Sequence, residues 1–379
     1  MTGANQDVGR RPSTNSLVGL AFIIAFVIVA LAFIDSALEK AEQRDLESQA
    51  QQAHAQGAQL VRQGKLDPAI ELLRKAHTLE RDNTLYELDL IDALIKTKRS
   101  DDAEPLMNEI LLHEPDDGRA NLSAARLALE KGKSADAISY YHRAIYGDWP
   151  QNAPAHRVAA RMELVHLLAV EGRKQELLAE LLPLEEEAKT NIPIQKELGR
   201  LFLVVGSPSR AAEAYRAMID RNPKDADAHS GLGDAELEMG EYRNARAAFL
   251  TALHYKPRDA SIQKRLDLSK ALTDLDPTPR RLASMEKYRR SIHILQLAYG
   301  NLNACLAQHP GVQPADAAQE LSTAGDALAA KPPSHANNEL SESVLGIAEK
   351  TWQARVAVCG ATVSRQDEAL RLIVEKLAQ

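Results

Sequence analysis

Aromatic residues and cysteine are scarce in this chain of 379 residues. Aromatic side chains make up 4%, which is too few for a β-sandwich or barrel, because strands favour aromatic and β-branched residues. The two cysteines, Cys305 and Cys359, exclude a disulfide-rich scaffold and a cysteine-rich zinc or iron–sulfur centre. The net charge of −7 argues against a broadly basic surface that binds nucleic acid. The composition therefore favours stacked helices, and the length allows two to three domains.

Motifs of catalysis and cofactor binding are missing too. The sequence contains no His-Glu-x-x-His pair, no glycine-rich phosphate loop, no Cys-x-x-Cys and no Gly-x-Ser-x-Gly. Its carboxylates are plentiful, but they lie on the polar faces of the expected helices, where solvation explains them. We therefore expect no catalytic residue, no metal site and no cofactor, and we do not interpret the chain as an enzyme.

The longest apolar run covers residues 17–34, LVGLAFIIAFVIVALAFI, and contains no charge. As a helix this run is about 27 Å long, just enough to cross a bilayer. The sequence thus predicts a short N-terminal tail at 1–16, a transmembrane helix at 17–34 and a helical linker at 35–49. A cleaved signal peptide is the alternative, because Ala30-Leu31-Ala32 has the small residues of a cleavage site.

Basic residues flank the apolar run on both sides, Arg10 and Arg11 before it and Lys40 and Arg44 after it. The positive-inside rule therefore gives a nearly even count. The tail is short, and a large domain is exported largely regardless of its charge. We favour a single-pass protein of the cytoplasmic (inner) membrane, with its C-terminal domain periplasmic or otherwise extracytoplasmic.

A pattern of 34 residues recurs along the middle of the chain. The same residue types return in two neighbouring segments, first as Leu198-Gly199, Gly206, Ala211, Tyr215 and Pro223 and then as Leu232-Gly233, Gly240, Ala245, Phe249 and Pro257. A six-residue insertion, 152–157, interrupts the phase once. Six repeats follow from this pattern, at 50–83, 84–117, 118–151, 158–191, 192–225 and 226–259.

The pattern resembles the tetratricopeptide repeat (TPR) family, whose repeat is a helix–turn–helix of 34 residues. The usual tryptophan near the start of a repeat is missing, since Gln195 and His229 stand in its place. The resemblance implies an all-α fold with an α-solenoid of about six repeats over 50–259, followed by a capping helix at 260–275. Such repeats bury their apolar faces only by stacking on one another.

Turn and cap residues support this interpretation locally. Five glycines follow apolar-periodic stretches, where a left-handed residue ends a helix, namely Gly64, Gly132, Gly172, Gly206 and Gly240. The second helices are then expected to begin with side-chain caps at Asp67, Ser100, Ser134 and Ser207. Small residues at Ala69, Ala103, Ala137, Ala211 and Ala245 are expected where two helices cross closely.

The 34-residue pattern ends before the C-terminal third. Asp276-Pro277-Thr278-Pro279 predicts a stiff linker, and 280–379 predicts a C-terminal helical bundle of three helices, the last one running to Val363. Cys305 and Cys359 lie on or beside apolar faces of these helices. They are a disulfide candidate if the domain is exported, and two buried thiols in a reducing compartment.

The family's first helices line a concave, partner-binding groove. Carried over to this sequence, the resemblance places Leu122, Arg126, Met162, His166, Lys196 and Arg200 in that groove. The basic members form a strip that suits an acidic or amphipathic peptide. The alternative is an ordinary solvated helix face. The asparagines of the family's chaperone-tail clamp are absent, so capture of a chaperone's C-terminal carboxylate is not expected.

The resemblance implies a membrane-anchored TPR scaffold or adaptor that binds protein partners in its groove. Envelope assembly, secretion or folding are the expected processes. The alternative is a cytoplasm-facing adaptor or import receptor anchored to a membrane. The expected partners are a protein or peptide and, through 17–34, the membrane, without nucleic acid. The sequence does not indicate an oligomeric state.

Overall fold

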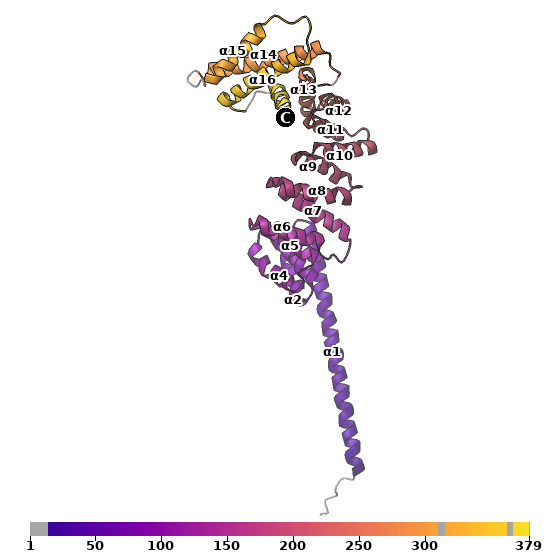
Figure 1. The fold of residues 1–379 in the computed structure, drawn as a ribbon. Coiled ribbons are helices and arrows are strands. Elements are labelled where there is room, and N and C mark those ends of the chain that lie inside the picture. The colour runs from indigo at the N-terminus through magenta and orange to yellow at the C-terminus, as the bar shows by residue number, and fades with distance from the viewer. Residues whose placement is uncertain (1–13, 280, 310–314, 362–366, 379) are drawn as a thin grey trace, which may run out of the picture. The chain divides into compact units, whose positions relative to one another are not determined.

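The structure is a computed structural model that describes residues 14–279, 281–309, 315–361 and 367–378, with the backbone alone for 14–25, 29, 32 and 315 (Figure 1). Within these ranges the regular structure is helical, and strand-like pairing is limited to one bridge between Asp117 and Asp148. The all-α prediction is thus confirmed. The chain divides into two compact units, Met1–Leu164 and Val165–Gln379, called the N-terminal unit and the C-terminal unit below.

Helix α1 (Thr14–Arg62) runs without a break from the apolar run into the first repeat (Figure 1). Its described large apolar side chains between Phe26 and Leu38 are exposed. Among the described residues, no helix combines the length and the hydropathy that a membrane crossing requires, so the transmembrane helix expected at 17–34 is not confirmed. Most of the expected tail, 1–13, lies outside the described residues.

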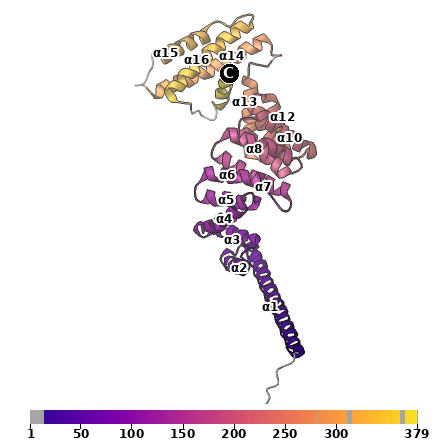
Figure 2. The same ribbon diagram turned by 60° about the horizontal axis from the view of Figure 1, so that its bottom comes forward.

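The N-terminal unit stacks antiparallel helix pairs (Figure 2). Helix α1 packs on α2, and the following pairs are α3 with α4 and α5 with α6. Ile91, Leu94 and Met107 are almost completely buried between these layers. The bounds are α2 (Leu66–Leu79), α3 (Thr84–Lys96), α4 (Ser100–His113), α5 (Gly118–Glu130) and α6 (Ser134–Tyr146), and α7 (Ala153–Val170) begins in this unit.

The C-terminal unit continues with the same kind of helix pairs. Its bounds are α8 (Lys174–Glu187), α9 (Ile192–Val204), α10 (Pro208–Arg221), α11 (Ala226–Glu238), α12 (Tyr242–Tyr255) and α13 (Ala260–Leu275). Helices α3, α5, α9, α11 and α13 begin at the first residues of the expected repeats or of the capping helix. The insertion 152–157 makes no separate loop, because α7 begins at Ala153 and the insertion lengthens that helix to 18 residues.

The turns within the repeats follow the glycine pattern. All five glycines have positive φ angles, between 69° and 77°. The predicted left-handed helix ends are therefore confirmed. Lys98 takes the equivalent place in the repeat 84–117 and also has a positive φ, 59°. A side chain with a β-carbon is strained in this conformation, so Lys98 holds the turn at a cost in free energy.

Of the caps expected for the second helices, Ser207 holds the N-cap position before Pro208, whereas Asp67, Ser100 and Ser134 lie inside their helices. The N-cap residues of these helices are Lys65, Arg99, Lys133 and Ser207, and none makes a side-chain cap bond. Their ψ angles lie between 52° and 76°, short of the extended backbone that a capping side chain needs. The first helices are capped instead, by Asn83, Asp117, Asn191, Asp225 and Asp259.

Close helix crossings lie at the expected alanines. Ala69, Ala103, Ala137, Ala211 and Ala245 are fully buried. Gly231 likewise allows close packing against Tyr215, because a β-carbon at this position would come within 2.3 Å of the tyrosine ring. Small side chains therefore set the distance between neighbouring helices.

The bundle contains four described helices, α14 (Ser284–Gln308), α15 (Ala315–Ala329), α16 (Asn338–Cys359) and α17 (Glu368–Leu377). The prediction of three is therefore wrong. Helix α16 ends at Cys359 because Gly360 turns the chain with a φ of 76°, and Val363 lies outside the described residues. Helices α14 and α16 run parallel, since Lys287 and Glu342 lie 3.7 Å apart near their starts and Cys305 bonds Cys359 near their ends.

Helix α17 joins the bundle to the last repeat. Its residues Leu370 and Ile373 share one core with Leu272 of α13, Leu295 of α14 and Trp352 of α16. The bundle is thus docked on α13 through a common apolar core within the C-terminal unit.

Candidate functional site

The basic residues that the sequence places in the C-terminal unit's part of the groove are ion-paired. Lys196 Nζ of α9 lies 2.6 Å from Asp227 Oδ2 of α11. Arg200 Nη2 lies 2.5 Å from Glu197 Oε1, and His166 Nε2 lies 3.3 Å from the same oxygen. Lys256, the residue that caps the C-terminal end of α12, is a second cation on Asp227. We call these six residues, His166, Lys196, Glu197, Arg200, Asp227 and Lys256, the cationic cluster.

Electrostatics in the cationic cluster favours the charged forms. The hydrogen bond from Lys196, followed by that from Lys256, lowers the pKa of Asp227 below its ordinary value. The bond from Arg200 lowers the pKa of Glu197 in the same way. Three permanent cations of the cluster thus contact two ionised carboxylates, and Asp225 and Asp259 also act electrostatically on Lys256.

The cationic cluster is open to solvent. The side chains of Lys196 and Arg200 are 53% and 56% exposed, and that of His166 is 52% exposed. Ion pairs at such exposure contribute roughly 0–1 kcal/mol each. A carboxylate of a bound peptide can therefore replace Asp227 or Glu197 at little cost.

The groove residues of the N-terminal unit lie in a different environment. Leu122 is 7% exposed, so it packs inside the repeat, and Met162 is half-buried. Arg126 makes a two-point bond to Glu163, with Nη2 2.6 Å from Oε1 and Nε 3.0 Å from Oε2. The bond to Glu163 raises the pKa of Arg126, and the Tyr141 hydroxyl donates to the same carboxylate at 3.0 Å. The guanidinium of Arg126 is therefore bound by Glu163 within the repeats.

Acidic groups dominate this part of the first-helix face. Arg119 of α5 bonds both Asp89 and Asp92 of α3, and the Ser123 hydroxyl donates to Asp92 at 2.6 Å. His54 Nε2 of α1 lies 2.5 Å from Asp89. The expected basic strip is thus not uniform, because its accessible positive charge is in the cationic cluster.

The acidic partners Glu163, Glu197 and Asp227 are not predicted from the sequence pattern above. A regular spacing identifies such partners, because a residue on one first helix pairs with a residue 31 positions later, on the next first helix. His166 with Glu197, Lys196 with Asp227 and Asp234 with Arg265 all have this spacing. Arg126 with Glu163 is 37 residues apart because the insertion 152–157 lies between them.

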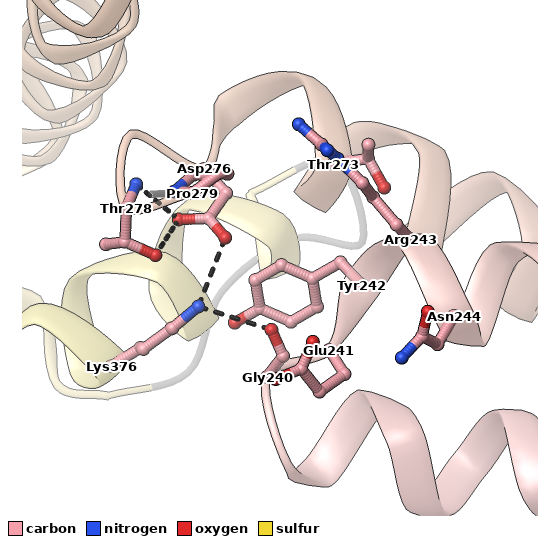
Figure 3. Close-up of a pocket in the computed structure, with 10 residues that line it drawn as sticks. All are labelled: Gly240, Glu241, Tyr242, Arg243, Asn244, Thr273, Asp276, Thr278, Pro279 and Lys376. Carbon is pink, nitrogen blue, oxygen red and sulfur yellow. Dashed lines mark hydrogen bonds and ion pairs between the residues drawn. The ribbon is translucent and has the colours of Figure 1, made fainter. Parts of the chain in front are cut away.

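A separate cleft of about 560 Å³ lies between the last repeat and α17 (Figure 3). Lys376 Nζ donates to the Gly240 carbonyl at 3.2 Å and to Asp276 at 3.1 Å, and it lies 4.7 Å from the centre of the Tyr242 ring. Asp276 also accepts from the backbone N–H and the hydroxyl of Thr278. Burial raises the pKa of Tyr242 to about 12. These contacts fasten α17 to the repeats.

Stacked helix pairs with a shared, charged first-helix face define a class of helical-repeat proteins that bind extended partners. Residues 60–127 and 196–261 match models of the tetratricopeptide repeat family. These segments, one in each unit, are therefore similar to tetratricopeptide repeats, as the sequence pattern indicated. No curated protein sequence matches the chain.

Several solved structures are similar to parts of this chain. YrrB, a TPR protein with an unusual peptide-binding site, is 15% identical over 52% of this chain and 97% of its own, with a TM-score of 0.42. PilW, a type IV pilus biogenesis factor, is 17% identical over 57% and 98%, with a TM-score of 0.43. The TPR2AB domain of yeast Sti1 is 18% identical over 73% and 97%, with a TM-score of 0.29. Likeness at this level carries no information on partners.

Proposed function

We propose that this protein is a TPR scaffold that binds an acidic segment of a protein partner on the cationic cluster. The observation that carries the proposal is the exposure of the first-helix cations there, with the side chains of Lys196 and Arg200 53% and 56% exposed. A first-helix face of stacked repeats is a preformed surface, so little ordering is required when an extended peptide binds.

Binding would proceed by exchange of ion pairs. A carboxylate of the partner takes the place of Asp227 on Lys196 or of Glu197 on Arg200, and the displaced side chain returns to water. Each exposed pair that is lost contributes little to stability, so the exchange costs little. The exposed cations attract the carboxylates of an acidic segment, and this attraction is strongest at low salt, where screening is weakest.

The proposed location is a membrane, with 17–34 as the anchor and the repeats on the extracytoplasmic side of the inner membrane. Exposed apolar side chains along the described part of α1, from Phe26 to Leu38, support an apolar environment there. Because α1 continues into the first repeat, the anchor would tether the repeats to the membrane and raise the local concentration of a membrane-associated partner. A role in envelope assembly, secretion or folding follows from this location.

The binding experiment compares two double variants with equal changes in charge. Lys196→Glu with Arg200→Glu alters the cationic cluster, whereas Lys224→Glu with Arg246→Glu alters exposed residues outside it. The probe is a fluorescent peptide of alternating glutamate and leucine, followed by anisotropy at low and physiological salt. The first variant is expected to bind roughly tenfold more weakly, a loss of about 1.4 kcal/mol, with unchanged helicity. Equal affinity of the two variants would exclude the cationic cluster as the binding surface.

Topology separates the proposed location from the alternative, a cytoplasm-facing adaptor or import receptor. A reporter enzyme that is active only outside the cytoplasm is fused after Gln379, and a reporter active only inside serves as its counterpart. The full chain is expected to stay with membranes after a carbonate wash and to activate the external reporter. Activity of the internal reporter alone would favour the adaptor, and release by carbonate would exclude the anchor.

A further inference from the structure

Three metal-ligating side chains meet at one end of the bundle. Cys305 lies in the last turn of α14 and is bonded to Cys359, the last residue of α16, with 6.2 Å between their Cα atoms. His309 caps the same end of α14, and its Nδ1 lies 3.4 Å from Cys359 Sγ. The three ligand atoms are within 4.8 Å of one another, the one such group among the described residues.

The spacing of these atoms fits a tetrahedral metal ion. Zinc bonds of about 2.3 Å to sulfur and about 2.0 Å to nitrogen place the two ligand atoms about 3.5 Å apart, close to the separation of His309 Nδ1 and Cys359 Sγ. Cys305 and His309 are four residues apart, so they share one side of α14. The two sulfurs would have to be about 3.8 Å apart, which requires that the disulfide open and the cysteine side chains rotate.

Helix ends make this place favourable for a cation. Cys359 ends α16 and Cys305 lies in the last turn of α14, so the carbonyl ends of two helices face the same region. The partial negative charge of a helix C-terminus stabilises a cation. The same charge disfavours the two thiolates that would bind the metal ion, so the helix ends alone do not select the metal site over the disulfide.

We propose that the reduced chain binds Zn²⁺ through Cys305, Cys359 and His309. A dithiol breaks the sulfur–sulfur bond, passes one proton to each cysteine sulfur and is itself oxidised to a disulfide. Zn²⁺ then displaces both thiol protons and binds two thiolates and the His309 imidazole, while water takes the fourth position on the exposed side of His309. Nδ1 gives up its 3.1 Å contact with the Cys305 carbonyl to bind the metal. Disulfide and metal site are therefore alternative states of the same residues.

The sequence predicts no metal site, because it lacks Cys-x-x-Cys and a His-Glu-x-x-His pair. The sequence signal for the proposed site is the four-residue spacing between Cys305, in the last turn of α14, and His309, the residue that caps this helix. The third ligand, Cys359, comes from a helix 50 residues further along, and only the fold brings it to His309.

The test uses the full chain, reduced with dithiothreitol and desalted without oxygen, with Co²⁺ as a spectroscopic probe and Zn²⁺ as competitor. The reduced protein is expected to bind one Co²⁺ with a sulfur-to-cobalt charge-transfer band and tetrahedral d–d bands, which Zn²⁺ abolishes. His309→Ala is expected to bind Co²⁺ at least tenfold more weakly. His293→Ala, an exposed histidine of the same helix, is expected to bind like the parent.

Helicity is measured by circular dichroism for every sample, as the control that the reduced chain is folded. The disulfide form is expected to give no cobalt bands. Unchanged affinity in His309→Ala would overturn the three-ligand site. Absence of charge-transfer bands from the reduced, folded parent would overturn the proposal altogether, as would bands that persist when both cysteines are replaced by serine.

Discussion

Lys98 offers a direct test of the repeat geometry. It occupies the turn position that glycine holds in five other repeats, with a φ of 59°. Its side chain is exposed, so its removal costs no packing. A residue with a β-carbon loses about 1–2 kcal/mol in this conformation, whereas glycine adds about 0.5–1 kcal/mol of backbone entropy to the unfolded chain. Lys98→Gly is therefore expected to raise the free energy of unfolding of the N-terminal unit by about 0.5–1 kcal/mol.

Gly132→Ala is the matched reverse change. Gly132 has a φ of 69°, and a β-carbon there would meet no heavy atom within 4 Å, so the substitution tests the backbone alone. It is expected to lower the free energy of unfolding by a similar amount. The measurement is urea unfolding followed by Trp149 fluorescence in a Trp352→Phe background, because Trp149 is then the remaining tryptophan and lies in the N-terminal unit. A midpoint for Lys98→Gly that is equal to or below the parent's, at the same slope, would refute the reasoning.

Three further changes test other parts of the fold. Ala245 is fully buried beside Phe249 and Ile262. Ala245→Leu is therefore expected to lower the free energy of unfolding, measured by urea titration, by about 1–3 kcal/mol. An unchanged midpoint would show that the two helices do not cross closely at this residue. Burial, with a smaller effect of Glu109, raises the pKa of Glu87 to about 7. Because the folded-state pKa is raised, protonated Glu87 contributes fully to the free energy of unfolding below about pH 4.5, and this contribution is lost as the pH rises through about 7. Glu87→Gln is expected to reduce this loss of stability by up to about 3 kcal/mol. Identical curves of stability against pH for the variant and the parent would contradict the prediction. The disulfide joins residues that are 54 positions apart. Reduction is therefore expected to lower the free energy of unfolding of the bundle by about 4 kcal/mol, measured by Trp352 fluorescence. Equal stability of the oxidised form and the metal-free reduced form would contradict this prediction.

Local backbone rules account for what the sequence predicted well. The glycines that end the first helices and the alanines at the crossings act through sterics at single positions, and these requirements recur with the repeat. Helix starts at Thr84, Ile192 and Ala226 follow from the same phase. The side-chain caps were predicted at the wrong helices, because the backbone after a left-handed turn does not reach the extended region that a cap needs.

The rest depends on contacts between distant parts of the chain. Lys196 and Arg200 were placed on the first-helix face from their positions within one repeat, but their ionic partners depend on how successive first helices stack. Helix α17 is not predicted as a separate helix, because the apolar spacing of α16 continues past Cys359 to Val363 in the sequence. In the structure Gly360 ends α16. The sequence does not predict His309 as a metal ligand, because Cys359, the side chain beside it, comes from another helix.

The docking of α17 sets an order on folding. The apolar residues Leu272 and Leu275 of α13 are covered by a core that includes Leu370 and Ile373, and Lys376 bonds Asp276 across 100 residues of sequence. During synthesis this contact forms only after the last ten-residue helix has left the ribosome, so the apolar face of α13 stays uncovered while the bundle is being made. A chain cut short before Glu368 keeps that face exposed, which marks it as incomplete for chaperones and proteases.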